Sequence, residues 1–195
     1  MVTKTEQKNT ESAGAVVVAK DNIANPAPLG LLAFGMTTIL LNIHNAGLFG
    51  LDSMILAMGI CYGGIAQLIA GFFEFKKGNT FGATAFTSYG AFWLSLVLLL
   101  VLPEMGIIKP VTSASLSAYL FMWGIFTAGM FAATMRAVIE MRWIFATLTV
   151  LFLLLSFNDL TGIAVVKNIA GLEGIFCGGL AMYLGFKQLY QETYK

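Results

Sequence analysis

Six long apolar stretches, separated by short polar segments, dominate the pattern of hydrophobic and polar residues along the chain. A helix needs about 20 mostly apolar residues to cross the hydrocarbon core of a bilayer. The fifth stretch is short for a span unless it is tilted or flanked by buried polar ends. The pattern predicts an all-α integral membrane protein, a bundle of six transmembrane helices over about residues 29–49, 53–75, 81–102, 116–135, 143–157 and 169–186.

This pattern divides the chain into three segments. Residues 1–28 are polar and lack the basic start, apolar stretch and cleavage site of a signal peptide, so we expect a flexible cytoplasmic N-terminal tail. The tail ends in Pro26 and Pro28, which suit a helix start because proline there costs no hydrogen bond. Residues 29–188 form the transmembrane domain, and residues 189–195 form a short cytoplasmic C-terminal end.

The basic residues predict the orientation in the membrane, because short cytoplasmic loops retain Lys and Arg. Only Lys109 and Lys167 fall in the loops of one side. The other side holds the remaining nine: Lys4, Lys8, Lys20, Lys76, Lys77, Arg136, Arg142, Lys187 and Lys195. Both termini are therefore expected in the cytoplasm, with the protein in the cytoplasmic (inner) membrane.

Composition excludes several other classes of protein. Hydrophobic residues make up 58% of the chain and charged residues only 11%, against about 25% charged in soluble domains. The formal net charge of +1 and the lack of a basic stripe argue against nucleic-acid binding. Cys61 and Cys177 lie singly in apolar runs, and no triad, metal cluster or phosphate loop is evident. We therefore expect neither an enzyme nor a bound metal or cofactor.

Polar residues within the spans are the candidates for a solute path, because each must be satisfied inside protein or water. In the first span, Phe34 shares one helical face with Thr38, Asn42 and Asn45. The second and third spans add Gln67, Thr84, Thr87 and Ser88, with Tyr89 at the margin of the third. A single hydroxyl more often bonds to its own helix backbone. Two such faces and an amide together favour a path for a small polar solute.

Charged residues are absent from the middle of the predicted spans, which argues against transport built on fixed mid-membrane charges. The solute would then be a weak acid, or an anion whose proton travels with it. Three groups lie near the span ends on the membrane side away from the termini and are candidates for proton handling: His44, Asp159 and Glu173. A lone histidine near an interface is more often a structural hydrogen-bonding group, so that alternative stays open.

Small residues also recur along the sixth span, where Gly174, Gly178, Ala181 and Gly185 form one stripe. Small residues let transmembrane helices approach closely, so this stripe predicts tight packing within the bundle or between subunits.

Several strings carry a resemblance to a known family. They are NPAPLGL at residues 25–31, GMTTILLNIHN at 35–45, AMG at 57–59, YGGIAQ at 62–67, KKGNTFG at 76–82 and AFTSYG at 85–90. Together they resemble the acetate uptake transporter family, and within it the bacterial succinate/acetate:proton permeases.

The resemblance implies a hexamer with one pore in each protomer, which takes up acetate, succinate and similar small carboxylates with protons. It places a hydrophobic constriction at Phe34, Tyr89 and Leu148. Ala181 corresponds to a size filter, and Asn25 and Thr37 join the candidate path through the matching strings. A passive channel for small anions or neutral solutes, such as acetic acid or ammonia, remains the alternative.

Overall fold

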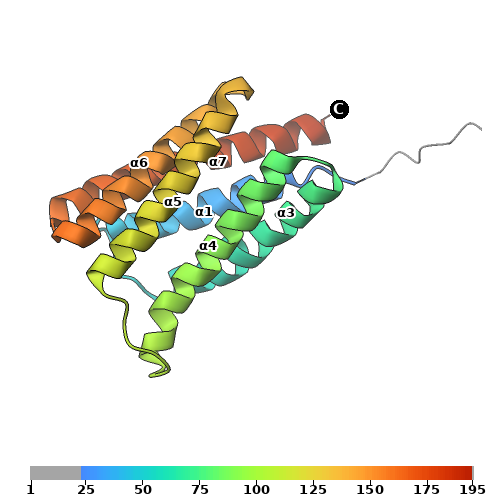
Figure 1. The fold of residues 1–195 in the computed structure, drawn as a ribbon. Coiled ribbons are helices and arrows are strands. Elements are labelled where there is room, and N and C mark those ends of the chain that lie inside the picture. The colour runs from blue at the N-terminus through green and yellow to red at the C-terminus, as the bar shows by residue number, and fades with distance from the viewer. Residues whose placement is uncertain (1–22, 195) are drawn as a thin grey trace, which may run out of the picture.

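The computed structural model describes residues 23–194 and shows a bundle of helices, with no strand in that range (Figure 1). Six spans are long and apolar enough to cross a membrane, so the predicted all-α, six-helix membrane protein is confirmed. The elements are α1 (Ala27–Asn45), α2 (Ser53–Met58), η1 (Gly59–Ala66), α3 (Gln67–Lys76), α4 (Thr80–Glu104), α5 (Ser113–Ala133), η2 (Thr134–Arg136), α6 (Ile139–Thr161) and α7 (Ala164–Thr193). The predicted N-terminal tail lies largely outside the described residues.

The observed helix ends differ from the predicted ones in both directions. The first helix stops at Asn45 rather than residue 49, and Gly47 follows in a left-handed turn with φ of 81°. The fifth span is a full 23 residues, Ile139–Thr161, and ends at Gly162 with φ of 72°. The last helix runs on to Thr193, so most of the predicted C-terminal end is helical. The apolar pattern does not detect the polar ends of the fifth and last helices, because these helices extend past the hydrocarbon.

The second span combines α2, η1 and α3, and its glycine-rich middle, η1, is π-helical. A Cβ atom at Gly63 would lie 2.8 Å from the Trp93 ring and 2.9 Å from the Thr37 methyl group. Only glycine fits there, so η1 packs directly between α1 and α4. Nothing in the hydrophobic pattern had indicated this wider helix.

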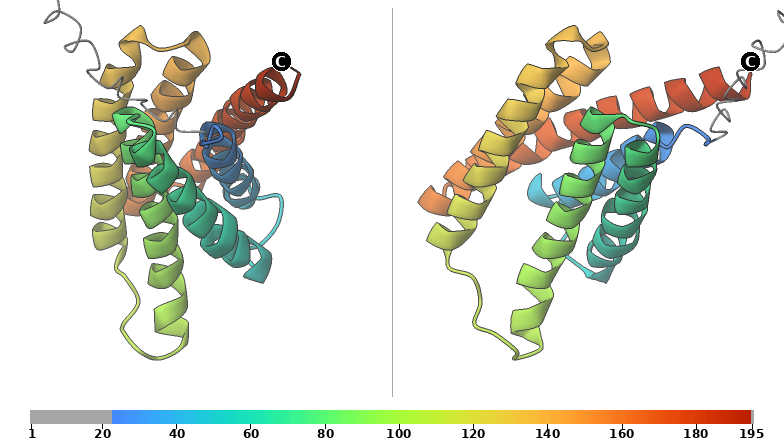
Figure 2. Two further views of the ribbon diagram at one scale, coloured as in Figure 1. Left: turned by 90° about the vertical axis from the view of Figure 1, so that its right-hand side faces the viewer. Right: turned by 45° about the vertical axis from the view of Figure 1, so that its right-hand side comes forward.

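The helix contacts run in a series from α4 through α3, α1, α7 and α6 to α5, and Figure 2 shows the long loop that joins α4 and α5. On one side α1 packs against both α7 and the second span, and α3 packs against α4; on the other side α6 packs against α5 and α7. A long loop, residues 105–112, joins α4 to α5, which meet through aromatic side chains such as Phe92 and Tyr119, stacked at 5.9 Å. The start of α1 and the end of α7 lie at the same end of the bundle (Figure 1). We call this the N/C end and the other the loop end.

The predicted small-residue stripe of α7 faces α1. A Cβ atom at Gly178 would lie 2.7 Å from the Gly35 carbonyl oxygen, and one at Gly35 would lie 2.7 Å from the Gly178 carbonyl oxygen. The two backbones are therefore in contact, as small residues at helix crossings permit.

This contact predicts a stability difference between neighbouring glycines. Gly178→Ala is expected to destabilise the protein by about 1–3 kcal/mol, because the methyl group forces two backbones apart. Gly179→Ala is the matched control, since nothing lies within 4 Å of a Cβ atom there. Thermal unfolding of the two variants in detergent measures the difference. Equal transition temperatures would contradict the close α1–α7 contact.

Candidate functional site

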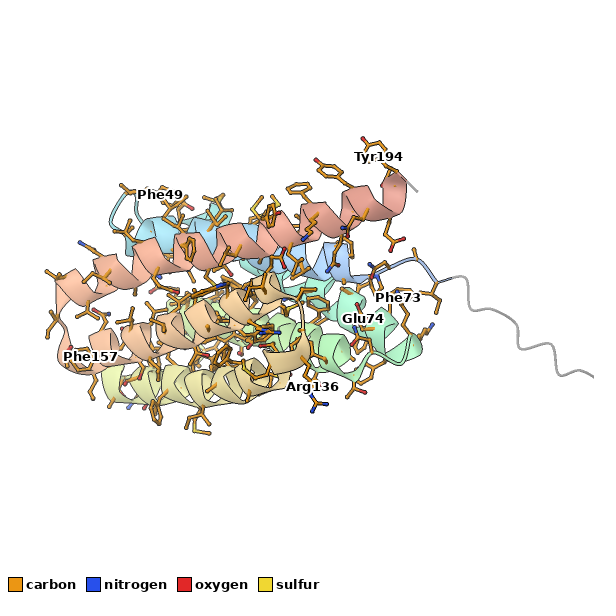
Figure 3. All side chains as sticks on the ribbon, turned by 90° about the horizontal axis from the view of Figure 1, so that it is seen from above. Phe49, Phe73, Glu74, Arg136, Phe157 and Tyr194 are labelled. Atoms are coloured by element: carbon orange, nitrogen blue, oxygen red, sulfur yellow. The ribbon has the colours of Figure 1, made fainter. Side chains whose placement is uncertain are left out.

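Two cavities enter the helix bundle from its opposite ends. The first, the N/C cavity, has a volume of about 60 Å³ and lies between α1, α3, α4 and α6. Its lining includes Glu74, which Figure 3 shows at the end of the bundle that carries Tyr194. The second, the loop cavity, has a volume of about 230 Å³ and is lined by Asn158, next to Phe157 at the far end in Figure 3. The two cavities share no lining residue and lie at opposite ends of the bundle.

The three residues that the resemblance assigned to a constriction meet at the floor of the N/C cavity. Phe34 of α1, Tyr89 of α4 and Leu148 of α6 all line it, and each side chain is at most 7% exposed. The ring centroids of Phe34 and Tyr89 are 5.8 Å apart. Three helices that are distant in sequence thus bring large apolar side chains to one point.

Packed side chains separate this floor from the loop cavity. Along α6, Leu148 lines the N/C cavity and Leu155 the loop cavity, and along α1 the corresponding residues are Phe34 and Leu41. Seven helical residues correspond to about 10 Å along an axis. The Phe92 ring packs edge to face against Phe152, with the ring centroids 5.1 Å apart. We call the layer of Phe34, Tyr89, Leu148, Phe92 and Phe152 the plug.

A hydrogen bond joins Tyr89, one of the plug residues, to α5. Its hydroxyl group lies 2.9 Å from Oγ1 of Thr127, which is fully buried on α5. Thr127 already donates its only hydroxyl proton to the Trp123 carbonyl oxygen at 2.7 Å, so Tyr89 is the donor to Thr127. This hydrogen bond holds the Tyr89 ring against α5.

Polar groups of the N/C cavity come mainly from α3. Gln67 and Glu74 are each only 1% exposed and line the cavity together with Asn79. One carboxylate oxygen of Glu74 accepts a hydrogen bond from the Asn79 side chain at 2.7 Å, and Asn79 in turn caps α4 by accepting from Gly82 at 3.1 Å. The other oxygen of Glu74 and the amide oxygen of Gln67 have no protein partner among the described residues. Both are buried hydrogen-bond acceptors of residues that line the cavity.

Polar groups of the loop cavity come from α1, α6 and α7. His44 and Asp159, two of the candidates for proton handling, line it with Asn45 and Lys167. Glu173, the third candidate, lies elsewhere on α7, with both carboxylate oxygens buried and without a partner in the described part of the chain. The structure therefore brings two of the three together.

Other predicted path residues face helix contacts. Asn42 points at Gly174 of α7 and donates to the Thr38 carbonyl oxygen at 2.9 Å. Thr37 faces Gly63, and the Thr87 methyl group packs at Gly71. Thr38 lies one turn beyond Phe34 on α1, with its hydroxyl oxygen buried and unpaired among the described residues. Of the polar stripe of α1, Asn42 is therefore used in the contact with α7.

Four further candidates also lie away from the two cavities. Ser88 lines a lateral groove between α4 and α5, and Asn25 caps α1 by accepting from the Ala27 amide at 3.2 Å. Thr84 is half-buried on α4, and Ala181 is fully buried in the same core as the plug. Neither of these two lines a cavity described above.

Sequence reasoning missed several residues of the site. Glu74 was placed only at the end of a span, although Gln67, Gly71 and Glu74 at positions i, i+4 and i+7 share one helical face. The residues around Thr127 and Lys167 in the sequence did not indicate that either lies at the site. No group of three His, Cys, Asp or Glu side chains within residues 23–194 is arranged to hold a metal ion.

Comparisons with known proteins identify a family. The GPR1/FUN34/yaaH family profile matches residues 8–195. The chain is 52% identical to the succinate-acetate/proton symporter SatP of Escherichia coli, over 88% of this chain and 92% of that one. It is 55% identical to an uncharacterized protein of Methanothermobacter thermautotrophicus, over 91% of each chain. A solved structure described as the bacterial acetate channel SatP superposes with a TM-score of 0.87 at 52% identity, over 88% of this chain and 95% of that one.

Proposed function

We propose, since the chain belongs to the GPR1/FUN34/yaaH family, that it carries acetate and other small carboxylates such as succinate across a membrane together with a proton. Its relatives are transporters and channels, and the chain is not an enzyme. The proposal rests on the N/C cavity, which is small, is lined by the buried Glu74 carboxyl group, and ends at the plug.

The size of the N/C cavity supports a small solute. A volume of about 60 Å³ is several times the roughly 10–15 Å³ that one buried water molecule needs, so the cavity has room for a small solute. Acetate has four non-hydrogen atoms and fits this space, whereas lactate and succinate are larger and require side chains of the plug to move. The apolar floor of Phe34, Tyr89 and Leu148 would contact the methyl group.

Glu74 supports coupling to protons. An ionised acetate in the N/C cavity would lie close to the Glu74 carboxylate, and two unit charges about 4 Å apart repel by about 4 kcal/mol at an effective dielectric constant of about 20. That repulsion corresponds to roughly a thousandfold loss of affinity. A proton shared between the two carboxyl groups removes it, so acetate would occupy this cavity with one proton.

The orientation and assembly follow as parts of this proposal. The N/C end is assigned to the cytoplasm because nine of the eleven basic residues belong to that side. Outward-facing side chains such as Phe72, Ile125 and Phe176 are at least half-exposed, which suits contact with lipid or with further copies in a hexamer. A monomeric native mass in mild detergent would contradict the hexamer.

Acetate uptake into proteoliposomes tests the function. With protein present, labelled acetate should enter faster when the outside is made acidic at constant membrane potential, after subtraction of diffusion into protein-free liposomes. A passive anion channel would respond to membrane potential and not to the pH gradient. Saturable uptake without any response to the pH gradient would therefore favour the channel.

A further inference from the structure

The loop cavity has one polar wall and one apolar wall. Leucine and phenylalanine side chains, mostly from α4 and α5, form the apolar wall, including Phe92, Leu96 and Leu120. The polar wall is formed by His44 and Asn45 of α1, Asn158 and Asp159 of α6, and Lys167 of α7. His44, Asp159 and Lys167 are the titratable residues that face the cavity within the described chain. At about 230 Å³, the cavity is far larger than acetate.

Lys167 carries the positive charge of this wall. Its Nζ atom lies 3.4 Å from Nε2 of His44, and Nδ1 of His44 lies 3.0 Å from the Phe49 carbonyl oxygen. A carbonyl oxygen only accepts, so Nδ1 carries the ring proton and Nε2 accepts from the lysine ammonium. His44 thus orients Lys167 as a neutral ring. One of the three ammonium N–H groups is used, and two remain for a carboxylate.

Asp159 carries the negative charge of the same wall. One carboxylate oxygen accepts from the neighbouring Asn158 side chain at 3.1 Å. Asp159 and Lys167 line one cavity without forming an ion pair in the described part of the chain. A cation and a carboxylate therefore face the same space without direct contact between their charged groups.

We propose that the loop cavity is a charge-selective capture site, in which Lys167 binds one carboxylate and Asp159 opposes a second ionised one. This inference rests on the proposed function. A monocarboxylate places its anionic group at Lys167 and its methyl group against the leucine wall. A dicarboxylate that reaches Asp159 is accepted when its second group is protonated, because that carboxylic acid donates a hydrogen bond to Asp159. The site therefore selects singly charged acids.

Uptake of labelled acetate by cells expressing each variant, with succinate as competitor, tests the site. We expect Lys167→Gln to raise both the acetate KM and the succinate inhibition constant about tenfold, because a charged hydrogen bond is lost. Asp159→Asn should lower the succinate inhibition constant about tenfold relative to the acetate KM at neutral pH. Succinate should inhibit the unmodified protein better as pH falls, and this pH dependence should flatten in Asp159→Asn.

Lys109→Gln is the charge-matched control, because Lys109 is the other basic residue of this side and is exposed in the α4–α5 loop. Lys167→Arg should restore most of the acetate affinity, which separates loss of charge from loss of fold. Equal effects of Lys109→Gln and Lys167→Gln would overturn the capture site. An unchanged ratio of succinate to acetate affinity in Asp159→Asn would overturn the charge selection. Absence of saturable acetate uptake by the unmodified protein would instead refute the proposed function.

Discussion

Leu148→Val is expected to raise lactate uptake about tenfold relative to acetate, the change that a barrier lowered by about 1.4 kcal/mol gives. Leu148 is 2% exposed and forms the floor of the N/C cavity with Phe34 and Tyr89. Large apolar side chains there would strip water from the solute and limit its size. Removing one methylene group widens that point, and lactate, with two more non-hydrogen atoms than acetate, gains most.

The measurement is competition between labelled acetate and unlabelled lactate in cells that express each variant. Ile55→Val serves as control because Ile55 is equally buried, at 2% exposure, and loses one methylene group away from both cavities. Ala181→Gly should act in the same direction but more weakly, since Ala181 packs in the core around the plug without lining either cavity. If Leu148→Val and Ile55→Val changed lactate uptake equally, Leu148 would be a packing residue and not part of the constriction.

Glu74→Gln is expected to remove most of the stimulation of acetate uptake by an inward-acidic pH gradient, a loss of about tenfold. Glutamine carries no charge, so the repulsion of about 4 kcal/mol between two carboxylates does not arise in this variant. Acetate then needs no shared proton to bind. The glutamine carbonyl oxygen can still accept from Asn79, so the cap of α4 is kept. Exchange of acetate down its own gradient should persist, because a neutral polar group still faces the solute.

Proteoliposomes with and without a pH gradient provide this comparison. Glu104→Gln is the matched control, since Glu104 is an exposed carboxylate at the other end of α4. A variant that is stimulated as strongly as the unmodified protein would show that Glu74 does not couple the proton. Glu173, whose buried carboxylate has no partner among the described residues, would then be the next carboxylate to replace.

Most of the fold could be predicted because a membrane leaves few choices. Backbone polar groups in hydrocarbon must bond within their own segment, so each apolar stretch of sufficient length becomes a helix. The predictions deviated where this constraint ends. Ile139 to Arg142, and Asn158 to Thr161, extend the fifth span beyond its apolar core. The π-helical segment η1 depends on the fit of Gly63 between Thr37 and Trp93, which belong to other helices.

The candidate site was only partly predictable from residue patterns. Phe34, Tyr89 and Leu148 came from the family resemblance, and the structure brings them to one cavity floor. Periodicity on α1 grouped polar residues on one face but could not tell which of them face a cavity. Asn45 lines the loop cavity, whereas Asn42, three residues earlier, points at α7 because Gly174 leaves room for it.

Length, hydropathy and composition act locally, so they were enough to predict a six-helix membrane protein with small-residue helix contacts. Which polar groups contact one another depends on the tertiary structure. The Tyr89–Thr127 hydrogen bond joins residues 38 positions apart, and the Lys167–His44 contact joins residues 123 positions apart. A side chain's function as a tether, a proton partner or a carboxylate ligand depends on what it faces across the bundle, and helix rotation and packing set that face.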